Sequence, residues 1–195
     1  MPPLRLLFSL AVAATPVLAQ APASAVQVTS FAAPEGRVLQ HRVLLSATPA
    51  EVYAAFTTAE GLRAWAVPMV TVDLRVGGIW ESAYSLTAKP GDAGNIKNRY
   101  AALVPNRLVA FQAIASPPGF PAPDLLRELV TVAELDSVGP GRTQLTLSMV
   151  GYRPLAGFDS LYQFFARGNA WSLEQLRERF EKGPVDWPAR LGGRN

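Results

Sequence analysis

The strongest pattern in the sequence is one long amphipathic helix, expected over residues 160–182. At about 100° per residue, its apolar and small side chains fall on one broad face, opposite most of the charged residues. Asp159 or Ser160 can cap its start, and Gly183-Pro184 ends it. The face comprises Leu161, Phe165, Ser172, Leu176 and Phe180, extended to one side by Phe164, Gly168 and Trp171. A helix with one apolar face must pack against another layer, which the rest of the chain has to supply.

The rest of the chain is dominated by short segments with a hydrophobic period of two, which is typical of β-strands. The expected strands cover residues 38–47, 70–76, 79–87, 95–104, 108–115, 126–135 and 143–151. Their short connections favour an antiparallel sheet, and the order of elements predicts an α+β fold with the sheet curved around the long helix. In the strand expected at 126–135, Glu134 breaks the alternation of Val130 and Val132, which predicts a β-bulge near Ala133.

Two short helices are expected directly after the first strand. Thr48 can cap the first of them, Pro49 suits its first position, and Glu51 stands where a capping box requires an acid. Residues 58–65 predict a second short helical turn.

The first 19 residues have the pattern of a secretory signal peptide. Arg5 precedes an apolar stretch, and Val17-Leu18-Ala19 forms a cleavage site. The alternatives are a buried helix or a membrane anchor, but an anchor needs about 20 unbroken apolar residues and Pro16 interrupts this run. We therefore expect the mature protein to be exported, to the periplasm or the medium, without stable insertion in a membrane after cleavage.

The folded domain is expected at residues 37–183. Residues 20–36 are rich in Ala, Pro and Ser and predict a flexible linker. Residues 184–195 predict a frayed C-terminal tail.

Composition narrows the chemistry available to this domain. The 195 residues include no Cys and one His, which excludes disulfide frameworks, zinc sites of the Cys type and thiol nucleophiles. The net charge of +3 is small and scattered, so no nucleic-acid partner is expected. No metal or cofactor site is expected either. His41 remains the candidate catalytic residue, as a general base or hydrogen-bond donor, and the alternative is a partly exposed strand histidine.

Several short motifs occur in an order that resembles a known superfamily. They are Ala47-Thr48-Pro49-Ala50-Glu51-Val52-Tyr53-Ala54-Ala55-Phe56, Leu62-Arg63-Ala64-Trp65, Val76-Gly77-Gly78-Ile79-Trp80, Val104-Pro105-Asn106-Arg107-Leu108-Val109, Gly141-Arg142-Thr143-Gln144-Leu145-Thr146-Leu147 and Gly168-Asn169-Ala170-Trp171. Over residues 38–183 the chain resembles the START-like, or SRPBCC, superfamily, and within it the activator of Hsp90 ATPase homologue 1-like family, which includes polyketide-cyclase-like proteins. The resemblance implies a helix-grip fold, in which about seven antiparallel strands wrap around the C-terminal helix and enclose a hydrophobic cavity.

Strand and helix periodicity predicts which side chains face that cavity. The candidates are Trp65, Trp80, Tyr84, Arg99, Tyr100, Phe111, Met149, Phe165, Gly168, Trp171 and Ser172. Small residues at Gly168 and Ser172 would leave room for a ligand. Arg99 would face a ligand carboxylate or pair with Glu128, and the alternative is a solvated surface arginine. The proline-rich segment 116–123, with Phe120 at its centre, would border the mouth. The alternative is that the aromatic residues fill an ordinary core.

Three functions are compatible with this pattern. The first is a module that binds a small hydrophobic or aromatic molecule, which the aromatic lining favours. The second is a cyclase- or hydrolase-type enzyme in which His41, Arg99 or Tyr84 polarises a bound carbonyl. The third is a co-chaperone-like interaction domain, as the resemblance implies, although an exported protein would not meet a cytosolic chaperone.

Overall fold

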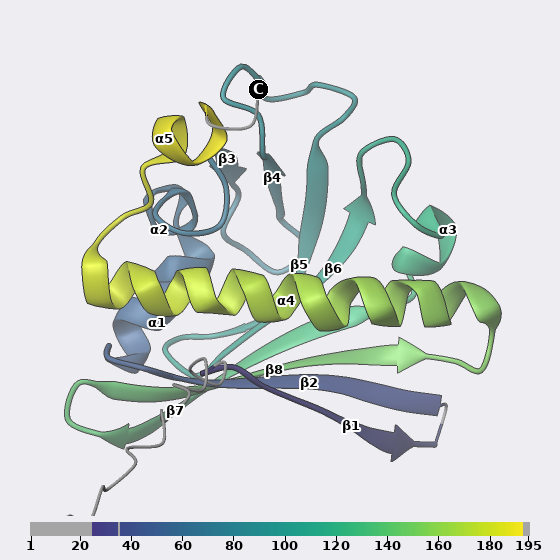
Figure 1. Ribbon diagram of the computed structural model, residues 1–195, viewed down its shortest axis with the longest axis horizontal. Coiled ribbons are helices and arrows are strands. Elements are labelled where there is room, and N and C mark those ends of the chain that lie inside the picture. Colours follow the sequence, from purple (N-terminus) through teal and green to yellow (C-terminus); the bar gives the residue numbers. More distant parts are fainter. Residues whose placement is uncertain (1–24, 35, 193–195) are drawn as a thin grey trace, which may run out of the picture.

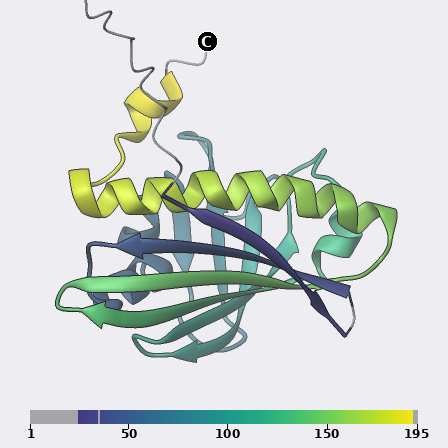
Figure 2. The same cartoon turned by 60° about the horizontal axis from the view of Figure 1, so that its bottom comes forward.

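The computed structural model describes residues 25–34 and 36–192, so the signal-peptide prediction for residues 1–19 lies outside the described residues. One antiparallel sheet of eight strands curves beneath a long helix, α4, which crosses its concave side (Figures 1 and 2). The strands are β1 (Gln27–Ala33), β2 (Gly36–Leu45), β3 (Met69–Val72), β4 (Ile79–Ala83), β5 (Ile96–Val104), β6 (Leu108–Ala115), β7 (Val130–Gly139) and β8 (Arg142–Tyr152). The helices are α1 (Pro49–Thr57), α2 (Ala59–Arg63), α3 (Pro123–Leu126), α4 (Ala156–Lys182) and α5 (Trp187–Gly192). The α+β class, the curved sheet and the long C-terminal helix are confirmed.

Strand order in the sheet is β1-β2-β8-β7-β6-β5-β4-β3, which leaves β1 and β3 as its two edges. The eighth strand, β1, lies where the sequence predicts a flexible linker, so that prediction is wrong for Gln27–Ala33. Six of its seven residues are exposed, and it pairs residue by residue with β2. Because the ladder to β2 rather than burial holds this strand, its sequence lacks the apolar alternation that marks the others.

The two short helices form as expected. The Thr48 hydroxyl accepts the Glu51 backbone N–H at 3.3 Å, and the Glu51 carboxylate accepts the Thr48 N–H at 2.8 Å, which completes the capping box. Thr58 then caps α2 by accepting the Gly61 N–H at 2.9 Å.

In strand β7, the residues that face the interior are not the ones that the sequence predicts. Its register with β8 runs without interruption from Val130 to Ser137, so no bulge occurs near Ala133. Thr131, Ala133 and Leu135 are the buried, inward residues, whereas Val130 and Val132 are only partly buried. The strand also starts later than expected, because Pro123–Leu126 form α3.

Helix α4 begins at Ala156, four residues before the expected start, and ends at Gly183. Beyond it, the C-terminal tail is not frayed as expected. The Trp187 indole donates to the Arg63 carbonyl at 2.6 Å, and the Val185 N–H donates to the Ala64 carbonyl at 2.9 Å. These bonds attach α5 and its linker to the end of α2.

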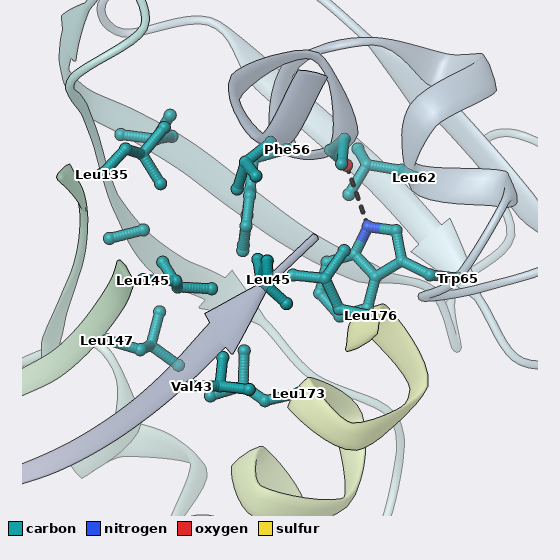
Figure 3. Close-up of a cluster of buried hydrophobic side chains, with 14 of the residues drawn as sticks. Val43, Leu45, Phe56, Leu62, Trp65, Leu135, Leu145, Leu147, Leu173 and Leu176 are labelled. Carbon is teal, nitrogen blue, oxygen red and sulfur yellow. Dashed lines mark hydrogen bonds between the residues drawn. The ribbon is translucent and has the colours of Figure 1, made fainter. Parts of the chain in front are cut away.

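The buried side chains form two clusters under α4. The larger lies beneath α1, α2 and the C-terminal half of α4, and includes Phe56, Trp65 and Leu176 (Figure 3). The smaller lies under the N-terminal half of α4 and includes Leu129, Met149 and Phe158. Residues of both clusters also line a cavity between the sheet and α4, so the interior is not filled by side chains alone.

Candidate ligand cavity

A cavity of about 250 Å³ lies between α4 and the inner face of the sheet. Its walls come from strands β3 to β8, from α1, α2, the segment after α2 and α3, and from α4. Most of the lining is apolar, with Trp65, Trp80, Phe111 and Phe165 among its aromatic members. Such a lining suits an apolar or aromatic ligand.

The mouth of the cavity is aromatic. Tyr84 and Phe164 belong to the lining and are 47% and 42% exposed, so the cavity reaches the surface beside them. Phe120 packs against Phe164 at 4.8 Å and against Phe165 at 6.0 Å between ring centroids. The proline-rich segment around Phe120 therefore borders the cavity, as the sequence predicts.

Most of the cavity residues expected from the sequence lie in its wall. These are Trp65, Trp80, Tyr84, Phe111, Met149, Phe165 and Ser172. Their placement follows from strand alternation and from the helical spacing of Phe165 and Ser172, which are two turns apart.

The other expected residues lie elsewhere. Tyr100 is fully buried behind the wall, where its hydroxyl donates to the Phe56 carbonyl at 3.1 Å. Arg99 is exposed, and Glu128, its expected partner, pairs with Arg153 instead.

Gly168 and Trp171 are also not part of the cavity wall. A Cβ added at Gly168 would meet nothing within 4 Å, and Trp171 is 43% exposed. At 100° per residue the two positions lie roughly 60° and 120° to one side of Phe165. Asn169 and Leu173 line the cavity on the other side of Phe165, whereas Phe164 lines its mouth on the same side as Gly168 and Trp171.

The wall also holds polar side chains, of which strand parity identifies Ser82, on the face of Trp80 and Tyr84, but misses Asn98 and Thr131. Ser82, Asn98 and Thr131 are 4%, 8% and 8% exposed and line the cavity from β4, β5 and β7. Asn98 could have been found from its alternation with buried Tyr100. Thr131 was hidden by the misassigned parity of β7. Asn169 joins them from α4, donating to the Met149 sulfur at 3.2 Å.

The lining carries no Asp, Glu, Lys, Arg or His among the residues that the structure describes. In the same part of the chain, no group of three or more His, Cys, Asp or Glu side chains is placed to hold a metal ion. A search of the described helices also finds none whose length and apolar character would let it cross a membrane.

His41 points inward, as strand parity predicts, but it lies outside the cavity wall. It is completely buried, so the alternative of a partly exposed histidine is wrong. Its Nε2 lies 3.1 Å from the Ala166 carbonyl of α4, and its Nδ1 has no hydrogen-bond partner within residues 25–34 and 36–192. Burial lowers the pKa of His41 below its usual value, with the Ala166 hydrogen bond opposing the shift.

Solved structures with the same fold come from several organisms. The Aha1 dimer of Colwellia psychrerythraea has a TM-score of 0.59 at 20% identity, covering 75% of this chain and 97% of that chain. CalU16 of Micromonospora echinospora gives 0.57 at 19% identity, over 87% and 92%. An HSP90 activator of Plasmodium falciparum gives 0.50 at 17% identity, over 80% and 96%. At these identities the likeness establishes the fold alone.

No curated protein matches the chain. The family model described as activator of Hsp90 ATPase homolog 1-like protein matches residues 46–181, which run from the capping residues of α1 almost to the end of α4. The chain belongs to the activator of Hsp90 ATPase homolog 1-like family.

Proposed function

We propose that this protein is an exported module that binds a small hydrophobic or aromatic molecule between the sheet and α4. The observation that carries the proposal is the 250 Å³ cavity with a mostly apolar, aromatic-rich lining. A cavity of about 150 Å³ engineered into another protein stays dry and binds benzene. The cavity here has room for one substituted ring, and burial of apolar ligand surface supplies about 25 cal/mol per Å².

Binding is better supported than a cyclase or hydrolase reaction. The reaction would use His41, Arg99 or Tyr84, but His41 and Arg99 lie outside the cavity wall. Tyr84 is in the wall but 47% exposed, and the described lining holds no acid, base or cation to act with it. A co-chaperone-like function would agree with the Plasmodium falciparum structure, which is an HSP90 activator, but no feature of the cavity favours it.

The cavity can be tested by filling it from α4. Ser172→Leu places a larger side chain in the wall, whereas Arg167→Leu adds a leucine on the exposed, opposite face of α4. We expect Ser172→Leu to weaken ethylbenzene binding at least tenfold because the leucine occupies the ligand volume. Arg167→Leu should leave the affinity unchanged. Titrations followed by amide shifts in nuclear magnetic resonance spectra would measure both constants, and equal affinities in the two variants would contradict the proposed site.

Export is tested separately. When the full chain is expressed in a Gram-negative host, we expect a periplasmic product whose first residue is Gln20, because cleavage follows Ala19. N-terminal sequencing and cell fractionation would measure this. A cytoplasmic product that retains Met1 would remove the export part of the proposal and leave the cavity untouched.

A further inference from the structure

Three buried polar side chains face the cavity from neighbouring parts of the sheet without protein partners. Asn98 lies opposite Trp80 of β4 and Ala113 of β6, and Ser82 is two residues further along β4 from Trp80. Thr131 lies opposite Phe111 of β6 and Met149 of β8. In the part of the chain that the structure describes, none of the three side chains has a hydrogen-bond partner in the protein. Each residue is more than nine-tenths buried, and each lines the cavity, to which its polar atoms are open.

Polar groups buried to this degree are nearly always hydrogen-bonded in folded proteins. Here the sheet ladder already uses the neighbouring backbone groups, and all three side chains lie in the cavity wall. Their hydrogen-bond partner is therefore a molecule inside the cavity, whether water or the polar group of a ligand that displaces water. An amide offers both donors and an acceptor, and a hydroxyl offers one donor and two lone pairs.

The side chains of the same wall also limit the charge that a ligand in the cavity can carry. Because the described lining contains no ionisable group other than the Tyr84 hydroxyl at the mouth, an ionised ligand would lie in an apolar space without a counter-charge. Burying an unpaired charge is far more costly than burying a neutral polar group. A carboxylate is therefore disfavoured, and the Arg99 side chain is not in the wall to compensate it.

We infer that the cavity selects neutral aromatic molecules carrying a hydroxyl or carbonyl oxygen, and that Asn98 is the specificity-determining residue that hydrogen-bonds this oxygen. The inference rests on the proposed function, because it requires a ligand in this cavity. Ser82 and Thr131 provide further hydroxyls on the same wall, so the oxygen can be bonded from more than one strand. The apolar remainder of the ligand packs against Trp80 and Phe111, whose rings lie 4.6 Å apart.

A matched set of ligands tests the inference: ethylbenzene, 4-ethylphenol and 4-ethylbenzoate. In a purely apolar cavity, the phenol loses affinity relative to the hydrocarbon because its hydroxyl is buried without a partner. In the wild-type protein we expect 4-ethylphenol to bind at least as tightly as ethylbenzene, and 4-ethylbenzoate to bind at least tenfold more weakly at pH 7. Asn98→Leu, which keeps the side-chain size, should weaken 4-ethylphenol about tenfold and leave ethylbenzene equal or tighter.

The matched control is Arg99→Gln, the next residue on β5, which is exposed and should change none of the three affinities. Asn98→Ala is a second variant with the same expected loss of preference, for use if the leucine disturbs folding. If ethylbenzene binds but the phenol preference is absent, or is the same in wild type and Asn98→Leu, the inference is overturned and the proposed function stands. Tight binding of 4-ethylbenzoate would also overturn it. If neither ethylbenzene nor 4-ethylphenol binds, both proposals fall.

Discussion

Replacing Trp65 by alanine is expected to lower the free energy of unfolding by about 3–5 kcal/mol, as for other buried aromatic residues. Trp65 is 6% exposed, and its indole donates to the Ala55 carbonyl at 3.0 Å (Figure 3). Its ring packs edge-to-face on Phe56 with centroids 5.2 Å apart. Alanine would remove this packing and leave a void that α1 and α2 can only partly close.

Urea unfolding at pH 7 measures the effect, and Trp171→Ala is its control. Trp171 is 43% exposed on α4, and its removal should cost less than about 1 kcal/mol. Sequence periodicity assigns both tryptophans to the cavity wall, so the pair discriminates between that assignment and the structure. Equal losses in the two variants would show that the orientation of α4 described here is wrong.

Acidification from pH 7 to pH 5 is expected to destabilise the protein by about 1–2 kcal/mol through His41. In the folded state this side chain is completely buried and its pKa is lowered by desolvation. In the unfolded chain it takes up a proton near its ordinary pKa of about 6.5. The unfolded state therefore binds more protons as pH falls below that value. Stability is full above about pH 6.5 and decreases below it by up to about 1.4 kcal/mol per pH unit.

His41→Leu is expected to remove this dependence between pH 7 and pH 5. The variant should be at least as stable as wild type at pH 5, because it also removes the unpartnered Nδ1. Carboxylates do not confuse the comparison: hydrogen bonds lower the pKa of Glu51 and of Glu81 below 4.5, so their contributions are lost at more acidic pH. A wild-type pH profile that parallels that of His41→Leu across this window would contradict the assignment.

Much of the fold could be predicted because its strongest signals are periodic. The long helix, the strand that ends at Val104 and the strand that begins at Leu108 stand out through repeated apolar spacing. The capping box at Thr48 is local chemistry that the sequence states directly. Side chains on these strands, such as Trp80 and Phe111, were therefore assigned to the correct face.

The errors occur where a contact distant in sequence decides the outcome. β1 is held by its hydrogen bonds to β2, and the residues of β1 alone do not predict this pairing. The rotation of α4 about its axis is set by what it covers, so Gly168 and Trp171 were assigned to the cavity wall although they lie outside it. Thr131 was missed because two flanking valines suggested the opposite parity, although Ala133 and Leu135 continue its alternation.

The two edge strands, β1 and β3, are at opposite ends of the strand order and are not paired with each other in the described part of the chain. In a closed barrel, the number of strands and their stagger fix the radius. An open sheet of this kind can change its curvature without losing a hydrogen bond between its strands. The gap beneath α4 is then set by the bulk of the side chains that prop the helix away from the sheet. Substitutions on a single helix can therefore retune the size of the molecule that fits, while the sheet keeps its register.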